Sequence, residues 1–277
     1  MRWLYRFFGF RTGSGFGFNA GLAIVPFAVL IMAYAAGSYL RHSENPDDKL
    51  LPSFGQIAEA VRGAVFDEDK RTGERIAIQD TIASVRRIAI GITAAAIVGL
   101  VAGLHTGLFG NLRALALPFL TFVSIVPPLA ILPILFVVFG VDELAKFALI
   151  FLGTFPMIAR DMDLAVRNIP QEQIVKTLTL GAAPFEVAYR VVFPQIFPRL
   201  LEVVRLSFGS AWLFLIAAEA IASTEGLGYR IFLMRRYLAM DMILPYVLWI
   251  TLLGFAADWM IRKWIAWRYS WYVKTDH

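Results

Sequence analysis

Residues 176–198, with the sequence KTLTLGAAPFEVAYRVVFPQIFP, lie between two strongly apolar segments of the chain. Gly181, Pro184 and Pro194 interrupt this stretch, and it is too polar to span a bilayer. Its apolar residues nevertheless recur with helical periodicity on both sides of Gly181. We interpret this short, structured insert between membrane-embedded segments as a docking site for a soluble partner.

The composition places the rest of the chain in a membrane. Of the 277 residues, 58% are hydrophobic and 17% are charged, whereas soluble domains carry about a quarter charged residues. The absence of cysteine excludes disulfides and thiolate metal sites, and the three histidines are too scattered for a metal cluster. The sequence also lacks clustered catalytic groups and a GxxxxGK[ST] loop, so we expect a non-catalytic chain without a cofactor of its own.

Six apolar segments approach or exceed the roughly 20 residues that a helical span needs. They cover about residues 18–40, 81–104, 115–139, 144–165, 200–221 and 242–265. This predicts an all-α membrane protein with a lead-in at residues 1–17, a transmembrane domain at 18–268 and a tail at 269–277. Between the first two spans, apolar residues of 53–66 share one face, which predicts an amphipathic helix on the membrane surface. A polar turn is expected at residues 67–75.

The distribution of basic residues predicts the orientation of these spans. Basic side chains precede the first span and end or follow the last one; they are Arg2, Arg6, Arg11, Arg262, Lys263, Arg268 and Lys274. Loops rich in Lys and Arg face the cytoplasm, so both termini are expected there, in a multi-pass membrane protein. The insert follows four spans and is expected to be cytoplasmic too. We attribute the net charge of +5 to this orientation rather than to nucleic-acid binding.

Local sequence rules predict the shape of the insert at residues 169–194. The preceding helix ends before Pro170, because the residue before a proline is disfavoured in the α region. Residues 171–180 can form a short helix that Gly181 caps in the left-handed conformation. Pro184 suits the first turn of a second short helix, which we expect to end at Pro194. This elbow is either a docking knob or a surface connector without a partner, and these rules alone do not separate the two.

The order of Gly181, nine further residues and then Val191-x-Phe193-Pro194 resembles the second half of the EAA loop of ABC importer permeases. The pattern of that family is E-A-A, three residues, Gly, nine residues and I-x-L-P. The E-A-A is not kept, because Val175, Lys176 and Thr177 stand in its place.

Four further motifs, in order and at matching spacing, extend this resemblance over about residues 50–268. They are similar to the nitrate, sulfonate, taurine and bicarbonate branch of these permeases. The motifs are Leu51-Pro52-Ser53; Val126-Pro127-Pro128-Leu129-Ala130 with Pro133; Phe139-Gly140 with Glu143-Leu144-Ala145-Lys146; and Gly226-Leu227-Gly228-Tyr229.

The resemblance implies a permease subunit of a bacterial inner membrane, with about six transmembrane helices and a cytoplasmic coupling-helix loop. It implies a second permease copy, expected to be a homodimer partner, and two cytoplasmic ATPase subunits that bind ATP and Mg. An extracytoplasmic binding protein would deliver a small, anionic solute such as nitrate, taurine or another sulfonate, or bicarbonate. A secondary transporter or a channel for a small solute is the alternative, although the prolines of the third span have no matching cluster in the second half and no filter motif is present.

Carried over residue by residue, the resemblance assigns a coupling loop that would contact the ATPase and an outer loop that would approach the binding protein. The coupling-loop residues are Lys176, Thr177, Leu180, Gly181, Ala182, Pro184, Phe185, Glu186, Arg190 and Pro194. The outer-loop residues are Gly226, Gly228, Arg235 and Arg236, and Arg230 lies in the same loop. Three arginines in this loop favour either an anionic solute or an acidic surface on the partner.

Interrupted helices and charges within spans point to a pore or gate. The candidates are Ser124, Pro127, Pro128, Pro133, Arg205 and Glu219. A packing kink explains the prolines equally well. Arg205 is expected to pair with Glu202 on the same helix, and Glu219 to cap or gate the pore at the outer side. Arg86 and Arg87 are expected either to snorkel to the outer interface or to attract an anion.

Overall fold

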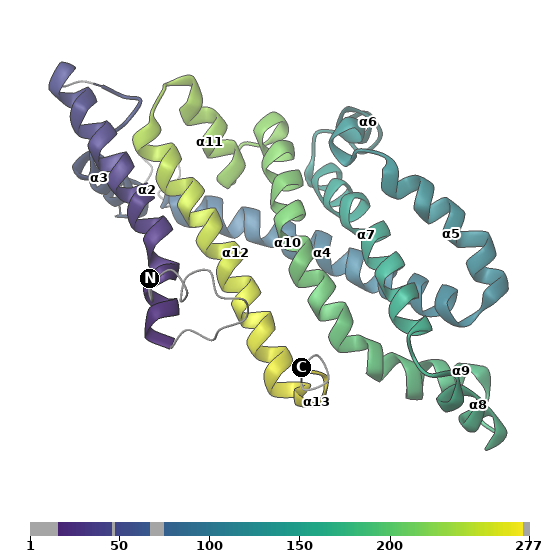
Figure 1. Cartoon of the computed structure of the whole chain (residues 1–277). Helices are drawn as coiled ribbons and strands as arrows, with labels where there is room; N and C mark the ends of the chain where they lie inside the picture. Colours follow the sequence, from purple (N-terminus) through teal and green to yellow (C-terminus); the bar gives the residue numbers. More distant parts are fainter. Residues whose placement is uncertain (1–15, 46–47, 67–74, 274–277) are drawn as a thin grey trace.

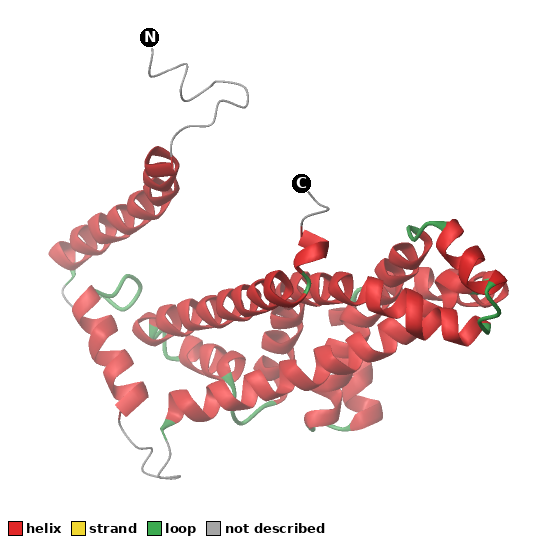
Figure 2. Cartoon of the chain, turned by 90° about the horizontal axis from the view of Figure 1, so that it is seen from below, coloured by secondary structure: helices red, strands yellow, loops and turns green. Residues whose placement is uncertain are grey.

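The computed structural model describes residues 16–45, 48–66 and 75–273. Within these ranges every element is helical and none is a β-strand, which confirms the predicted all-α class (Figures 1 and 2). In chain order the elements are α2 (Phe16–Glu44), α3 (Phe54–Phe66), α4 (Ile76–Leu108), α5 (Gly110–Ile125), the 3₁₀ segment η1 (Pro128–Ile131), α6 (Leu132–Phe139), α7 (Glu143–Arg167), α8 (Gln171–Thr179), α9 (Pro184–Glu186), the π-helical segment η2 (Val187–Val192), α10 (Phe193–Ala222), α11 (Leu227–Arg236), α12 (Met240–Arg268) and α13 (Ser270–Val273).

The helix bundle has two ends, which we call the α11 end and the α8 end after the helices that lie there. Figure 1 shows α3, α6 and α11 towards the upper side of the view, and α8, α9 and α13 towards the lower side. This arrangement groups the segments that the sequence places on one side of the membrane. The predicted helix at 53–66 is confirmed as α3, and its position on the membrane surface stays a prediction. The predicted turn at 67–75 falls almost wholly outside the described residues.

All six predicted spans coincide with helices, but only five have the apolar composition of a span. Four single helices are long and apolar enough, and α5 with η1 and α6 passes the same test when this pair, bent by 83°, is counted as one span. The remaining helix, α7, is long enough but carries Lys146 near its start and Asp163 near its end. Both of these side chains are almost fully buried, so α7 shields these two charges within the protein.

A row of small residues brings α4 and α7 into close contact. Gly91, Ala95, Gly99, Gly103 and Gly107 recur at every fourth position of α4, and side chains of α7 pack against the glycines of this row. A Cβ atom at Gly99 would lie only 2.7 Å from Cγ2 of Ile158. Small residues at this spacing let two helix backbones approach closely in a membrane. We did not predict this pairing, although the four-residue spacing in the sequence is a signal for it.

Helix α2 stands away from the other helices, as Figure 2 shows near the N-terminus. Only 6% of its apolar window is buried. Its attachment lies at its C-terminal part, where the hydroxyl of Tyr34 donates to the carbonyl of Pro52 at 2.6 Å. Nearby, Arg41 binds Asp48 at 2.6 Å, and this hydrogen bond lowers the pKa of the Asp48 carboxyl. The bundle therefore consists of the helices from α3 onward.

Candidate functional site

The α8–α9 loop, which we define as residues 168–192, turns at Gly181 as predicted. Gly181 has a φ of +91°, in the left-handed region that favours glycine because it lacks a Cβ atom. Its N–H donates to the carbonyl of Leu178 at 3.0 Å, and the N–H of Ala182 donates to that of Thr177 at 3.3 Å. These bonds close the end of α8 and direct the chain towards α9.

The second half of this loop differs from the prediction. Pro184 is the first residue of α9, as expected, and the Glu186 carboxylate accepts from the N–H of Ala183 at 3.1 Å. The helix does not end at Pro194, however, but continues through η2 into α10. In η2 the hydrogen bonds shift by one residue, so that the N–H of Phe193 donates to the carbonyl of Ala188. This wider turn accommodates a proline that lacks an N–H without breaking the helix.

One face of the α8–α9 loop is exposed and strongly apolar. Leu180 is 87% exposed and Phe185 is 63% exposed. The other predicted coupling-loop residues are also wholly or partly exposed; they are Lys176, Thr177, Gly181, Ala182, Pro184, Glu186, Arg190 and Pro194. The opposite face is buried through Val187, Ala188 and Val192. The loop therefore combines a firm base with an exposed apolar tip, as a docking knob requires.

Contacts from two other helices hold the base of this loop in place. The Tyr189 hydroxyl lies 3.4 Å from Nε2 of His105 at the end of α4, and the rings of Phe185 and Phe109 lie 6.2 Å apart. The side-chain amide of Gln195 in α10 donates a hydrogen bond of 3.2 Å to the side-chain oxygen of Gln173 in α8. These contacts attach the loop to the ends of α4 and α10.

A second polar cluster occupies the same end, next to the C-terminal helix α13. Arg199 of α10 binds Asp161 of α7 through two bonds of 2.8 and 3.0 Å. The Tyr272 hydroxyl of α13 donates to Glu202 at 2.8 Å, and burial, together with this carboxylate, raises the pKa of Tyr272 to about 12. These bonds hold α13, which lies in the predicted tail at 269–277, against the start of α10.

The broken span lies where the prolines predict it. Pro127 precedes η1, Pro128 is its first residue and Pro133 lies in the first turn of α6. Ser124, near the end of α5, donates to the carbonyl of Thr121 at 2.8 Å and accepts from Arg160 of α7 at 3.1 Å.

The other two candidates for the pore, Arg205 and Glu219, lie on α10. The expected pairing of Arg205 with Glu202 is wrong, because Arg205 binds Asp258 of α12 at 3.2 Å and Glu202 binds Arg199 at 3.4 Å. Arg205 therefore pairs with a neighbouring helix, whereas Glu202 pairs with Arg199 within α10. The six candidates therefore do not form one cluster.

The most heavily connected charge is Arg87 of α4, at the α11 end. Its guanidinium binds Glu143 through two bonds of 2.7 Å, Glu219 at 2.8 Å and Glu225 at 3.3 Å. The Arg87 residue is only 1% exposed, so the expectation that it snorkels or attracts a free anion is wrong. Arg86 does point outward, 3.9 Å from Glu143. We call Ser84, Arg87, Glu143, Lys146, Glu219 and Glu225 the Arg87 network.

Glu219 is fully buried within this network. Its carboxylate accepts from Ser84 at 2.8 Å, from Arg87 at 2.8 Å and from the N–H of Gly228 at 2.8 Å. Buried carboxylates are stable when they are paired and hydrogen-bonded in this way. The structure therefore shows Glu219 anchoring the loop that follows α10, and its role as a gate stays a prediction.

Asp80 and Arg230 fix the adjoining part of the outer loop. Gly226, with a φ of +121°, donates its N–H to Asp80 at 2.8 Å, and Arg230 binds the same carboxylate at 2.8 Å. Arg230 thus forms an ion pair with Asp80 inside the protein. Arg235 and Arg236 at the end of α11 remain exposed, and they are the cations of this loop that a partner or solute could reach.

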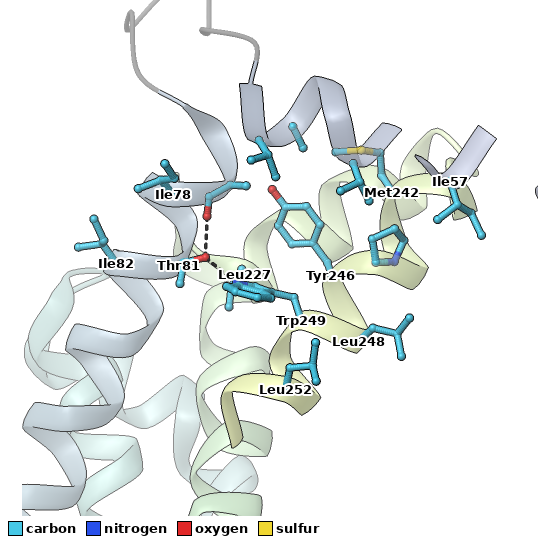
Figure 3. Close-up of a pocket in the computed structure, with 15 residues that line it drawn as sticks. Ile57, Ile78, Thr81, Ile82, Leu227, Met242, Tyr246, Leu248, Trp249 and Leu252 are labelled. Atoms are coloured by element: carbon cyan, nitrogen blue, oxygen red, sulfur yellow. Dashed lines mark hydrogen bonds between the residues drawn. The ribbon is translucent and has the colours of Figure 1, made fainter. Parts of the chain in front are cut away.

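An apolar cavity of about 600 Å³ lies beside this loop, between α3, α4 and α12. Figure 3 shows Ile57, Ile78, Leu248 and Leu252 around it, and the indole N–H of Trp249 bonded to Thr81. Among the described residues, those that line it are apolar apart from Thr81 and Tyr246, and none is charged.

Within the described part of the chain, no three His, Cys, Asp or Glu side chains are grouped so as to hold a metal ion. The described residues instead form an exposed apolar loop tip at one end and an ion-pair network at the other.

The family model described as binding-protein-dependent transport system inner membrane component matches residues 92–265. The chain belongs to this family. It is 33% identical over 184 residues to the taurine transport system permease protein TauC of Escherichia coli (strain K12), which covers 66% of this chain and 67% of TauC. It is 31% identical over 199 residues to the bicarbonate transport system permease protein CmpB of Synechococcus elongatus, which covers 70% of this chain and 69% of CmpB. The chain is therefore a permease subunit of an ABC transporter.

A solved structure supports the fold. The inward-facing MetNI methionine ABC transporter matches with a TM-score of 0.57 and 18% identity, over 68% of this chain and 95% of that chain. The family match also confirms the resemblance that the loop and the proline motifs indicate.

Proposed function

We propose that this chain forms the translocation path of an ATP-driven importer for a small anionic solute. Its partners are two cytoplasmic ATPase subunits that bind ATP and Mg, a second copy of this chain, and an extracytoplasmic binding protein. The single observation that carries the proposal is the α8–α9 loop, whose tip is exposed and apolar and whose base is fixed to α4 and α10. In a chain without a GxxxxGK[ST] loop, such a knob provides the contact through which an ATPase can act.

The coupling in this proposal is mechanical. ATP closes the two ATPase subunits and displaces the α8–α9 loops that they hold. Helices α7 and α10 tilt with the loop, because they flank it in the chain and Arg199 joins them through Asp161. The path then alternates between inward-open and outward-open arrangements, which is a two-state change biased by a ligand.

The orientation follows from the basic residues at the two termini, which place the α8 end in the cytoplasm and the α11 end outside. The binding protein would then dock at the α11 end, where Arg235 and Arg236 are exposed. Two exposed cations at this entrance suit an anionic solute. TauC and CmpB, named for taurine and bicarbonate transport, point to the same class of sulfonate or inorganic anion.

The test measures uptake of radiolabelled taurine and bicarbonate by the native cells, with this chain present or deleted. We expect deletion to abolish uptake of one of the two solutes, and arsenate, which depletes ATP, to abolish it as well. A protonophore should leave short-term uptake largely intact. Uptake that survives arsenate but stops with the protonophore would contradict the proposal and favour a secondary transporter, and flux that survives both would favour a channel.

A further inference from the structure

Arg87 connects three segments that lie far apart in the sequence. Through its three carboxylate partners it joins the first residue of α7 (Glu143), the last turn of α10 (Glu219) and the loop before α11 (Glu225). It also donates to the backbone carbonyl of Glu225 at 2.9 Å. The only covalent route between α7 and this loop passes through α8, α9 and the whole of α10, so Arg87 provides a direct connection.

The two helices held by Arg87 are the two that flank the α8–α9 loop. Helix α7 ends at Arg167, just before the loop, and α10 begins at Phe193, just after it. Figure 1 shows both helices running from α8 and α9 towards the α11 end. A displacement at either end of this pair is therefore carried to the other end by two helices whose far ends share one guanidinium.

The network also holds the backbone of the outer loop. The N–H of Leu227 donates to the Ser84 hydroxyl at 2.8 Å, and the N–H of Gly228 donates to Glu219 at 2.8 Å. Helix α11 starts at Leu227 and ends next to Tyr237, which is 67% exposed. A partner that moves α11 therefore pulls on groups that Arg87 binds directly.

We propose that Arg87 is a positioning residue that couples the outer loop to the α8–α9 loop. Contact of a binding protein with α11 displaces the loop at Glu225, and Arg87 passes this displacement to the ends of α7 and α10. The planar guanidinium has five donors, so it binds Glu143 through two bonds and still reaches Glu219 and Glu225; lysine, with three donors on one nitrogen, cannot reproduce this geometry. This inference rests on the proposed function, because it presupposes an ATPase at the α8 end and a binding protein at the α11 end.

Coupling between two sites is reciprocal, so ATP at the α8 end must change the state of the outer loop. The chain contains no cysteine, so a single Tyr237→Cys substitution provides a specific probe there. The complex is purified with its ATPase subunits from native cells and placed in lipid nanodiscs. The rate at which a maleimide labels residue 237 is then measured with and without Mg-ATP and vanadate, together with the rate of ATP hydrolysis.

In the complex with the Tyr237→Cys substitution, we expect ATP with vanadate to change the labelling rate of residue 237 at least about fivefold. The double substitution Arg87→Met with Glu219→Gln removes one charge of each sign and keeps an acceptor for Gly228. It should retain ATP hydrolysis and abolish the change in labelling. Arg87→Lys should reduce the change, because it keeps the charge but not the fork. The matched control, Arg41→Gln with Asp48→Asn, removes an ion pair outside the network and should leave the change intact.

Two results would overturn the role of Arg87. One is an ATP-dependent change in the double variant as large as in the control pair. The other is the absence of any change in the Tyr237→Cys background while ATP is hydrolysed. A complex that contains no ATPase at all would overturn the proposed function instead, so the two failures are distinguishable.

Discussion

The Arg87 network and the α8–α9 loop treat charged and apolar side chains in opposite ways. The network, at the α11 end, buries Arg87, Lys146 and Glu219 and pairs its charges with one another. The loop, at the α8 end, exposes Leu180 and Phe185 to the surroundings. A protein keeps buried charges only where a fixed geometry holds them, and it keeps exposed apolar patches only where something covers them.

This difference separates two kinds of dependence. The Arg87 network is complete within one chain, so changing it should first affect folding and the relative positions of helices. The α8–α9 loop is incomplete without a partner, so changing its tip should leave folding intact and affect assembly. Substitutions in the Arg87 network should therefore lower the stability of the fold, whereas substitutions at the tip of the α8–α9 loop should weaken partner binding and leave stability nearly unchanged.

The largest loss of stability is expected from Arg87→Met. It leaves Glu219 buried without its countercharge, and breaking such a pair costs about 3–5 kcal/mol. The thermal midpoint of the detergent-solubilised chain, followed by size-exclusion chromatography, should fall steeply, and adding Glu219→Gln should restore most of it. If the Arg87→Met variant were as stable as the unaltered chain, the network would contribute little to the stability of the fold.

A smaller loss is expected where α4 meets α7. Gly99→Leu places a side chain where a Cβ atom alone would lie 2.7 Å from Ile158, and overpacking of this kind costs about 1–3 kcal/mol. The matched control is Gly21→Leu on α2, since no atom lies within 4 Å of a Cβ there. Equal thermal midpoints for the two variants would contradict the close packing of α4 and α7.

Gly181→Ala should have a slightly smaller effect, because it strains the left-handed turn of the α8–α9 loop. A non-glycine residue in this conformation is less stable by about 1–2 kcal/mol. Hydrogen exchange of the amides in the loop should become faster, while exchange in the Arg87 network stays unchanged. The control, Gly55→Ala in α3, lacks a positive φ and should leave the exchange of the loop unaltered.

The smallest effect is expected from Tyr272→Phe, which removes one half-buried hydrogen bond to Glu202 worth about 0.5–1.5 kcal/mol. The folded-state pKa of Tyr272 is raised to about 12 from 10.0, so the hydroxyl contributes fully below pH 10 and its contribution disappears as the pH rises through 12. The difference in thermal midpoint between the two proteins should be constant from about pH 7 to 9. A difference that shrinks within that range would argue against this bond.

Local rules predicted much of the fold. The apolar segments gave the helices, the periodicity of residues 53–66 gave α3, and the conformational freedom of glycine gave the left-handed turn at Gly181. The prolines gave the break between α5 and α6. Each of these features depends on residues that are close together in the sequence.

The charged contacts could not be predicted in the same way. Arg87 lies 132 residues from Glu219, and no spacing rule connects residues that meet only after the helices pack. Arg205 was assigned to Glu202 because a partner on the same helix was the nearest one in sequence, whereas α12 supplies Asp258 instead. The continuation through Pro194 was missed because a π-helical turn leaves no distinct signal in the residues that form it.

The most direct test of the central claim is the recovery of an ATPase with this chain. Leu180→Glu combined with Phe185→Glu changes exposed positions. Stability should move by no more than about 0.5 kcal/mol at Leu180, and somewhat more at Phe185, whose ring lies 6.2 Å from that of Phe109. A tagged chain purified in mild detergent from its native cell, with mass spectrometry of what accompanies it, should recover an ABC ATPase subunit. We predict that the double variant reaches the membrane at normal abundance and loses that subunit, whereas Arg41→Gln with Asp48→Asn keeps it. Recovery of the ATPase at the unaltered level by the double variant would contradict the assignment of the α8–α9 loop as the docking site.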